Sequence, residues 1–389
     1  MKQTFKIILF IESSRASGRD LLRGLARYAQ LHGPWSFYWE PGGLEHGQPN
    51  LKDLDADGII FRDVGHFNAQ ALRLGIPAVV VGHSGREVRR LVNVLTDSAA
   101  IGRMAAEHFL ERGLKHFAFC GYSGTRLEQT PWSLDRQESF RRRVEEAGFA
   151  PPANHVMPLL EGEWQKHRRH LGAWLEKLPK PLGVMACNDD CGAQLIEACK
   201  LQGFSVPDTV SVIGVDNDEV VCGLTDPAMS SVAINFERAG YQAAEALDWL
   251  MHGSKKPPRK IEARALHVVA RRSTDIMAVE DPHLAKALTC IRDRSRFPLT
   301  VNEVAQAAGV SRRSLERRFR EQMGGTILKE IRRQRTEQIE RLLLETNQPV
   351  TRLAESLGFP DTRHFARYFR STKKMSPLAF RKRFGRLSL

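Results

Sequence analysis

The stretch VTRLAESLGFPDTRHFARYFRSTKKMSPLAFRKRF (350–384) decides how the C-terminal part of the chain folds. Its apolar residues recur at helical spacing on both sides of Gly358, which is typical of two helices joined by a tight turn. Asp361 stands where it caps the second helix, and Pro360 stops the first from running on. The predicted core residues are Leu353, Leu357, Phe365 and Phe369. The pattern predicts a helix-turn-helix unit at about 350–372.

An earlier stretch, VNEVAQAAGVSRRSLERRFREQMGGT (301–326), has the same design. Gly309 makes the turn, and Ser311 caps the second helix. The residues predicted to face inward are Val304, Ala305, Ala308, Leu315 and Phe319. The sequence therefore predicts a further helix-turn-helix unit at about 301–323, and only helices are expected from Asp281 onward.

The basic charge of the chain is confined to this end. Residues 281–389 contain 24 Lys and Arg against 11 Asp and Glu, a net charge of +13, whereas residues 1–280 contain 34 of each and are neutral. A polyanion is therefore expected to bind at the C-terminal end alone. Together with the two helix-turn-helix units, this charge predicts a DNA-binding domain.

The segment TILKEIRRQRTEQIERLLLETN (326–347) joins the two units, and its apolar residues follow a helical stripe. They are Ile327, Leu328, Ile331, Ile339, Leu342 and Leu343. About 21 helical residues span roughly 31 Å, close to the roughly 34 Å between successive major-groove faces of DNA. One chain is therefore expected to read two adjacent turns of one DNA face.

The outward residues of the second helix in each unit can bond base edges, since Arg pairs with guanine and Glu accepts from cytosine. The candidate DNA-binding residues are Arg312, Arg313, Glu316, Arg317, Thr362, Arg363, His364 and Arg367. The alternative is that these Arg-rich faces are merely solvated. Which arginines contact bases and which contact phosphates stays open at this point.

The residues before 275 alternate strand and helix patterns. The apolar run IILFI (7–11) is typical of a strand buried on both faces, and WSFYWE (35–40), DGIIFRD (57–63) and PAVVVGH (77–83) repeat the strand signal. This order predicts parallel sheets flanked by helices, in two α/β halves of about 95 and 160 residues with a ligand crevice between them. We expect an α/β sensor at 1–275 and an all-α domain at 276–389.

Four segments resemble the LacI/periplasmic sugar-binding family in their order and spacing. They are TDSAAIGRMAAEHFLERGLKHFAFCG (from 96), DRQESFRRRVEEAGF (from 135), MACNDDCGAQLIEACKLQGFSVPDTVSVIGVDND (from 185) and SSVAINFERAGYQAAEAL (from 230). That family's N-terminal DNA-binding headpiece is not expected here, because the first strand begins near Lys6. The resemblance implies a two-lobed, periplasmic-binding-protein-like sensor.

The stretches 301–326 and 350–384 resemble the two helix-turn-helix units of the AraC family. The matching features are Gly358-Phe359 at the turn, Arg367 outside, and Ser376-Pro377 before a last helix. The combined resemblance implies a transcription regulator, an activator of pentose utilisation that binds double-stranded DNA as a homodimer in the cytoplasm. D-xylose is the expected effector. Another pentose, a hexose or a purine stays open, because the loop ESSRASGR (12–19) departs from the family.

The resemblance also implies where the sugar binds. It places Arg136, Asp216 and either Asn188 or Asp189 on loops at the crevice. The loop 12–19, with Glu12 and Ser13, is the expected contributor from the first lobe, and Trp132 is the expected stacking residue. Trp39 or Trp164 are alternative stacking residues. Planar polar groups suit vicinal hydroxyls, and an aromatic ring suits the apolar face of a sugar. Capping or surface pairing is the alternative role for the polar residues, and core packing for the tryptophans.

Other classes of protein are disfavoured. A sugar-acting enzyme is not expected, because no G-x-S-x-G elbow, Walker loop or G-x-G-x-x-G is present. No apolar run is long enough for a signal peptide or a membrane span, which argues against an exported sugar-capture protein. Cys187, Cys191, His167 and His170 have spacings that suit a metal, but buried thiols and a solvated helix face are the expected interpretation. No cofactor is expected.

Overall fold

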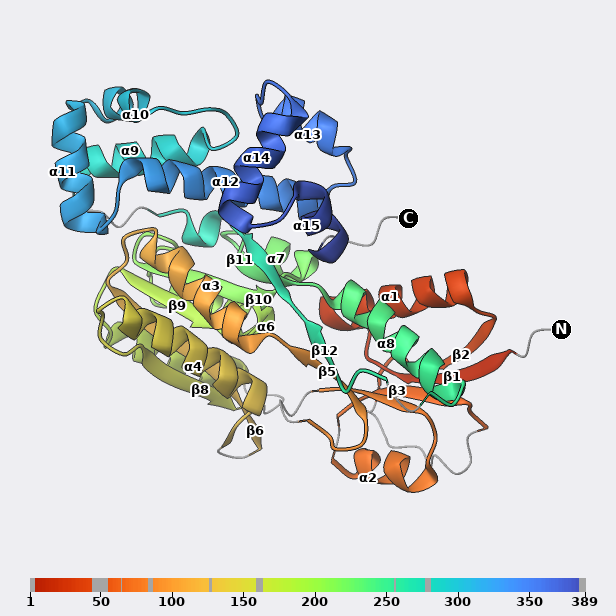
Figure 1. Cartoon of the computed structure of the whole chain (residues 1–389). Coiled ribbons are helices and arrows are strands. Elements are labelled where there is room, and N and C mark those ends of the chain that lie inside the picture. Colours follow the sequence, from red (N-terminus) through yellow and green to blue (C-terminus); the bar gives the residue numbers. More distant parts are fainter. Residues whose placement is uncertain are drawn as a thin grey trace. The chain divides into compact units, whose positions relative to one another are not determined.

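The computed structural model describes residues 4–43, 55–63, 65–82, 87–125, 128–158, 164–254, 257–276 and 281–384. The chain divides into two compact units, one formed by residues 1–108 and 116–275 and the other by residues 109–115 and 276–389. Figure 1 shows an α/β architecture for the first unit and helices alone for residues 281–384 of the second. No helix in the described ranges has the length and apolarity that a membrane crossing needs.

The first unit contains two sheets, which form its two lobes. The first-lobe sheet has the spatial order β12 (Lys260–Ala263), β5 (Val92–Thr96), β4 (Ala78–Val81), β3 (Gly58–Arg62), β1 (Phe5–Phe10) and β2 (Trp35–Trp39). Its strand pairs are all parallel. The helices of this lobe are α1 (Ala16–His32), α2 (Gly65–Leu74) and α8 (Phe236–Met251). The run 7–11 is buried, as predicted for a strand covered on both faces.

The second-lobe sheet has the order β13 (Ala265–Val269), β11 (Ser230–Ile234), β10 (Val210–Asp216), β9 (Leu182–Ala186), β6 (His116–Thr125) and β7 (Glu128–Gln129), with β8 (Ala153–Pro158) also paired to β6. Strands β6, β8, β9, β10 and β11 run parallel, while β7 and β13 are antiparallel to their neighbours. The helices are α3 (Ser98–Leu110), α4 (Pro131–Glu146), α5 (Trp164–Glu176), α6 (Asp189–Leu201) and α7 (Glu219–Leu224), with a short 3₁₀ turn at Arg272–Thr274. The predicted parallel, helix-flanked sheets are confirmed.

The expectation of two consecutive halves is wrong. Helix α8 and strand β12 belong to the first lobe, although they follow the second-lobe strand β11 in the sequence. Figure 1 shows α1 and α8 side by side. Two glycines allow this close approach. A Cβ on Gly24 would lie 1.9 Å from the carbonyl oxygen of Glu237, and one on Gly240 would lie 2.1 Å from that of Leu21. The C-terminal part of the sensor is therefore built into its N-terminal lobe.

The second unit places two small apolar cores along one central helix. Its helices are α9 (Pro282–Asp293), α10 (Val301–Ala308), α11 (Arg312–Met323), α12 (Ile327–Glu345), α13 (Val350–Ser356), α14 (Thr362–Lys373) and α15 (Pro377–Phe384). The N-terminal half of α12 contributes Ile327 and Ile331 to a core with α9, α10 and α11. Its C-terminal half contributes Ile339 and Leu343 to a core with α13 and α14. Both helix-turn-helix units are thus anchored to α12.

The predicted stripe of α12 needs one correction. The sequence predicts that Leu328 faces inward, but it is 46 % exposed. It follows Ile327 directly, and one residue turns an α-helix by about 100° away from the buried face. Leu344, which the stripe does not include, is buried instead. The helix has 19 residues, so it spans about 28 Å rather than the expected 31 Å.

Candidate functional site

An ion pair stands at the carboxyl end of the first-lobe sheet. Glu12 follows β1 and Arg62 ends the neighbouring parallel strand β3, so both side chains meet at the same edge. Nε of Arg62 donates to Oε2 of Glu12 at 3.0 Å, and Nη2 of Arg62 donates to Oε1 of Glu12 at 2.7 Å. The two side chains are mostly buried, at 14 % and 11 % exposure. This two-point geometry holds the carboxylate in one plane.

The second lobe contributes a buried arginine. Arg136 lies within helix α4, and not on a loop as the sequence predicted, because α4 begins five residues earlier at Pro131. Its side chain faces inward and is 3 % exposed. Its guanidinium donates to the carbonyl oxygen of Cys187 and lies 3.5 Å from Oδ1 of Asp216. Its Nε is buried and makes no hydrogen bond to the described residues. The ring of Trp132, one helical turn earlier, lies 4.9 Å from the guanidinium, so Arg136 covers one face of that ring.

Asp216 stands on a constrained backbone at the end of β10. Asp216 and Asn217 have φ values of 99° and 52°, both in the left-handed region that non-glycine residues rarely adopt. Three hydrogen bonds hold this turn: Asn217 N donates to Ser231 Oγ, Asp218 N donates to Asp189 Oδ2, and Arg271 donates to Asn217 Oδ1. The protein's own hydrogen bonds therefore hold this strained turn in a defined conformation.

Burial dominates the electrostatics of this carboxylate. Burial raises the pKa of Asp216, Arg136 opposes the rise, and Asp190 adds to it. Arg62 and Arg15, which come from the first lobe, also lower the pKa of Asp216. Charges from both lobes therefore act on one carboxylate.

The two residues weighed as alternatives, Asn188 and Asp189, both have partners within the protein. Oδ1 of Asn188 caps α6 by accepting from Cys191 N at 2.9 Å. Asp189 accepts from Ser231 Oγ at 2.6 Å and from Asp218 N at 2.7 Å. Burial and then Asp216 raise its pKa. Asp189 is therefore placed to hold the Asp216 turn, and Asn188 to begin the helix beneath it.

The segment between β1 and α1 links the two lobes. Asp218, which caps α7, also accepts from Ala16 N at 2.8 Å and from Arg19 at 2.9 Å. Arg15 forms an ion pair with Asp190 at 3.0 Å. Because α1 belongs to the first lobe and α6 and α7 to the second, these contacts tie the lobes together beside Glu12 and Asp216.

Of the remaining candidate ligand residues, Ser13 and Trp39 lie near Glu12, whereas Trp164 cannot be placed. Ser13 lies in the same segment, and its carbonyl accepts from Arg19. Trp39 ends the edge strand β2 and donates from its indole to the carbonyl of Ile11, next to Glu12. The side chain of Trp164 lies outside the described residues. The structure thus brings most of the predicted ligand residues to one region.

Sequence reasoning missed Arg62, Asp190 and Asp218 in this region, and it included Arg15 and Arg19 only as members of the loop 12–19. A signal was present for Arg62, because it ends a predicted strand parallel to the one before Glu12, and such strand ends share an edge. The others were hidden, since their contacts join lobes that are distant in sequence.

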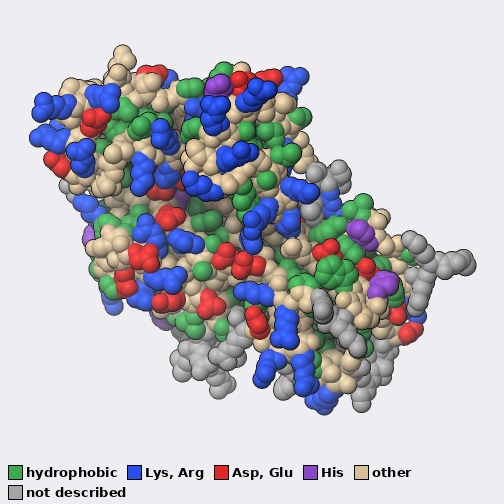
Figure 2. Space-filling model, viewed as in Figure 1, with side chains coloured by type: hydrophobic (Ala, Val, Ile, Leu, Met, Phe, Trp, Pro, Cys, Tyr) green, Lys and Arg blue, Asp and Glu red, His purple; other side chains and the backbone are tan. Residues whose placement is uncertain are grey.

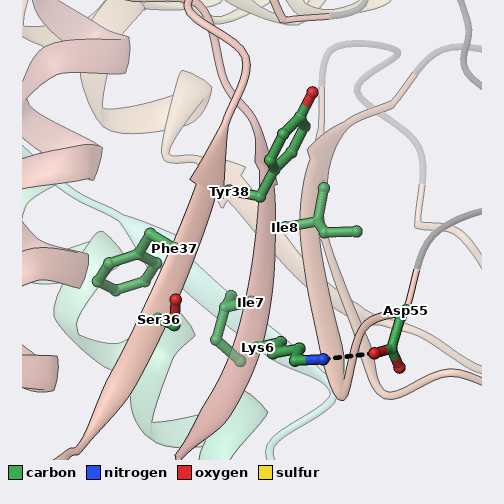
Figure 3. A pocket seen from close by; sticks show the side chains of 7 residues that line it. All are labelled: Lys6, Ile7, Ile8, Ser36, Phe37, Tyr38 and Asp55. Carbon is green, nitrogen blue, oxygen red and sulfur yellow. Dashed lines mark hydrogen bonds and ion pairs between the residues drawn. The ribbon is translucent and has the colours of Figure 1, made fainter.

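A pocket elsewhere in the first lobe is not near these groups. It has a volume of about 330 Å³ and is lined by Lys6, Ile7, Ile8, Ser36, Phe37, Tyr38 and Asp55. Figure 3 shows an ion pair between Lys6 and Asp55 at one side and the ring of Tyr38 pointing away from it. It extends from the amino-terminal part of β1, whereas Glu12 follows the carboxyl end. No group of three or more potential ligands for a metal ion occurs in the part of the chain that the structure describes.

The first helix-turn-helix unit is built as predicted. Thr300 and Glu303 form a capping box at α10, Gly309 has a left-handed φ of 69°, and Ser311 caps α11 by accepting from Ser314 N. Its predicted inward residues are buried. Arg312, Arg313 and Arg317 are exposed on α11, and Glu316 forms an ion pair with Arg312 at 2.8 Å.

The second unit also matches its prediction. Asp361 caps α14 by accepting from His364 N at 2.7 Å, and the four predicted core residues are buried. Gly358 has a left-handed φ of 69°. The exposed residues on α14 include Arg363, His364 and Arg367, with Thr362 half-buried. Figure 2 shows Lys and Arg side chains distributed over the visible face of the helical unit.

One arginine near this surface has a structural role that the sequence did not indicate. Arg335 of α12 donates to the carbonyl of Leu357, and its guanidinium lies 4.2 Å from the ring of Phe359. These contacts join α12 to the turn of the second unit. Arg335 is therefore a packing residue despite its charge.

Comparisons with known domains define the class of protein. Residues 106–274 match a periplasmic binding protein-like domain, and residues 304–383 match a helix-turn-helix domain. The chain is a transcription regulator with a periplasmic-binding-protein-like sensor domain and a helix-turn-helix DNA-binding domain.

The similarity to particular regulators covers nearly the whole chain. The chain is 29 % identical to the xylose operon regulatory protein of Escherichia coli (strain K12), over 97 % of this chain and 96 % of that protein. The corresponding protein of Haemophilus influenzae is 28 % identical, over 98 % and 99 % of the two chains. The solved structure of the xylose-binding transcription activator XylR has 26 % identity and a TM-score of 0.60, covering 99 % of this chain and all of that one.

Other solved regulators share the sensor fold alone. A LacI family regulator from Enterococcus faecium with bound ribose is 19 % identical, with a TM-score of 0.57, and covers 71 % of this chain and all of that one. The fold of the first unit is therefore one that holds sugars in other proteins.

Proposed function

We propose that this protein is a D-xylose-responsive transcription activator that binds DNA as a homodimer in the cytoplasm. The observation that carries the proposal is the similarity to xylose operon regulatory proteins across both domains. We take residues 1–275 as the sensor and 276–389 as the DNA-binding domain.

We assign the sugar to the region between the lobes. Arg136 and Asp216 bind its hydroxyls from the second lobe, Glu12 and Ser13 bind it from the first, and Trp132 lies against the ring of the sugar. The buried Nε of Arg136 supports this assignment, since it has no hydrogen-bond partner among the described residues. Asp189 supports the site by holding the Asp216 turn, and Asn188 supports it by capping α6.

We assign DNA recognition to the outward faces of α11 and α14. The residues are Arg312, Arg313, Glu316, Arg317, Thr362, Arg363, His364 and Arg367. Sugar binding stabilises one arrangement of the lobes and so alters the dimer and its engagement of DNA. This requires the sugar to bind that arrangement better than the alternatives.

Calorimetric titration with a sugar panel tests the effector. D-xylose is expected to bind more tightly than L-arabinose, D-ribose and D-glucose. Binding of another sugar in place of D-xylose would keep the regulator class and replace the effector. Absence of binding across the panel would contradict the sugar assignment as a whole.

A further inference from the structure

We propose that Asp281 and Arg318 form a positioning pair, which holds the recognition helix α11 in the orientation that reads DNA. The two side chains do not touch bases themselves. They act through α11, whose outward arginines enter the major groove. The inference rests on the proposed function, because it takes from there the assignment of DNA recognition to the outward face of α11.

The two oxygens of the Asp281 carboxylate bind different helices. Asp281 is the N-cap of α9, and its Oδ1 accepts from the backbone N of His283 at 2.9 Å and from that of Leu284 at 3.4 Å. Its Oδ2 accepts from Nη1 of Arg318 on α11. The Asp281 side chain is buried, at 7 % exposure. One buried carboxylate therefore begins α9 and also holds α11 against it.

Arg318 faces differently from the candidate DNA-reading arginines of α11. Those arginines are exposed, whereas Arg318 is half-buried and lies at the edge of the face that contributes Leu315 and Phe319 to the core. Its Nε donates to Oγ of Ser314, one turn earlier on the same helix, at 3.3 Å. The guanidinium is thus bonded both to α11 and to the start of α9, so it links the orientations of the two helices.

A second contact joins the start of α9 to the turn of the same unit. Nδ1 of His283 bonds the carbonyl oxygen of Ala308 at 2.7 Å, and it must be the donor because a carbonyl oxygen only accepts. Ala308 is the last residue of α10, and the turn at Gly309 follows it directly. The side chains of residues 281 and 283 therefore contact both helices of the first helix-turn-helix unit.

The second helix-turn-helix unit holds its recognition helix at the same position by different chemistry. Tyr368 of α14 lies three residues after the buried Phe365 and directly before the buried Phe369. Arg318 has the same place in α11. The hydroxyl of Tyr368 donates to the carbonyl oxygen of Arg332 on α12 at 3.2 Å. Each recognition helix is therefore bonded at this position to a helix that shares its core, α14 to α12 and α11 to α9.

The orientation of α11 matters because base contacts depend on geometry. A recognition site works when its groups are held within about 0.5 Å and 10–20° of the productive arrangement. The apolar core fixes the buried face of α11 but not the directions of its outward arginines to this precision. Loss of the positioning pair should therefore weaken base recognition in the half of the DNA site that α11 reads, and leave the half read by α14 unchanged.

The test measures a specificity ratio, the affinity of the full-length protein for a site selected from a random-sequence library divided by its affinity for random-sequence DNA. Fluorescence anisotropy gives both affinities, and the selection is repeated with each variant. The variants are Arg318→Met, Arg318→Lys, Asp281→Asn and the combination of Asp281→Asn with Arg318→Met. Asparagine caps a helix about as well as aspartate, so Asp281→Asn retains the cap of α9 and removes the charge that holds Arg318.

Arg294→Met is the matched control. Arg294 stands at the C-terminal end of α9 and pairs with Glu303 at 3.1 Å, so this change removes the same charge and one ion pair from the same helical unit. A further variant, Arg313→Ala with Arg317→Ala, identifies the half of the selected site that α11 reads. Denaturant unfolding of every variant shows whether it is folded.

Arg318→Met and Asp281→Asn should each lower the specificity ratio by at least about fivefold, and the combined variant should lower it no further than the more severe single change, because all three lose the same bond. Asp281→Asn is the sharper test, since it makes the domain more positive and charge alone would strengthen DNA binding. Arg318→Lys keeps the charge and should lose less, which also serves if Arg318→Met fails to fold. Arg294→Met should keep the ratio within about twofold of wild type.

The repeated selection separates positioning from a loss of stability. Partial unfolding lowers the fraction of active protein and leaves the base preference as it is. With Arg318→Met or Asp281→Asn, the preference should instead relax in the half of the site that α11 reads and persist in the half that α14 reads.

Failure of the positioning pair and failure of the proposed DNA recognition give different results. Wild-type ratios and preferences in folded Arg318→Met and Asp281→Asn would overturn the pair while the assignment of α11 stands. Additive losses in the combined variant, or equal relaxation of both halves of the site, would also overturn it. If Arg313→Ala with Arg317→Ala leaves the ratio and the preferences unchanged, the assignment of DNA recognition to α11 is overturned, and the inference with it.

Discussion

At the scale of the residue, the sensor depends on charged side chains taken out of water. Arg136 is almost completely buried, and its partners are a carbonyl oxygen, a carboxylate and an aromatic ring. A buried charge is tolerated when such partners compensate for lost solvation. The same holds for Arg62 with Glu12. These residues are therefore where single substitutions should separate binding from folding.

Replacing Arg136 should abolish most of the sugar response. In Arg136→Ala the donors to the sugar and to Asp216 are lost, so D-xylose affinity should fall by at least about 10- to 100-fold. Nonspecific DNA binding should be unchanged, because it depends on the basic second unit. Calorimetry and a fluorescence anisotropy assay on random-sequence DNA measure the two effects, with Arg141→Ala on the same helix as control. Wild-type sugar affinity in folded Arg136→Ala would remove Arg136 from the site.

At the scale of the element, close contacts between helices position the parts of each unit. Helices α1 and α8 touch through glycines, and α1 begins directly after the loop that follows Glu12. The position of α1 therefore affects the candidate sugar site. In the second unit, α12 plays the corresponding role, because both apolar cores depend on it.

Gly240→Ala should destabilise the sensor. Alanine usually stabilises a helix relative to glycine by about 0.5–1 kcal/mol, but here the new Cβ would meet the carbonyl of Leu21. Separating the helices should cost about 1–3 kcal/mol, so the net effect is a lower unfolding midpoint. Gly223→Ala in α7 is the control, since a Cβ added there would have nothing within 4 Å. A midpoint for Gly240→Ala at or above that of wild type would contradict the close contact.

Arg367 should contribute to specific DNA recognition through α14. It is exposed beside the buried Phe365 and Phe369, which fix the orientation of the helix. Arg367→Ala should weaken binding to a site selected from a random-sequence library by roughly 1–3 kcal/mol and relax the base preference at one position. Titrations over a range of salt concentrations distinguish a base contact from a phosphate contact. A uniform loss across sequences with a reduced salt slope would assign Arg367 to a phosphate instead.

At the scale of the whole molecule, one chain carries a sensor and a DNA reader, and control of the reader by the sensor requires that the two binding equilibria be linked. If D-xylose changes the affinity for the selected DNA site by a given factor, that DNA must change the affinity for D-xylose by the same factor. A factor of about 5–150 is expected for an allosteric regulator. Calorimetric titration of the protein with D-xylose, with and without saturating DNA, measures this factor. Equal affinities in the two titrations would contradict regulation of DNA affinity by the sugar.

The sequence by itself determined the local structure and the class of the protein. Both turns, both caps and nearly all the core residues of the helix-turn-helix units were predictable, because each follows from residues within about 25 positions of one another. Strand positions were predictable for the same reason. The wrong prediction for Leu328 also has a local cause. Leu328 is apolar, but it lies on a face of α12 where its side chain stays 46 % exposed.

Only the tertiary structure decided how distant segments meet. The return of α8 and β12 to the first lobe, the pairing of Arg62 with Glu12 and the contacts of Arg15 and Arg19 with the second lobe join residues far apart in sequence. Periodicity and capping carry no information about such pairs, since they report on neighbours along the chain. These contacts are set by the order of strands in the sheets and by the close packing that glycines permit between helices. They decide which charged side chains meet at the candidate sugar site.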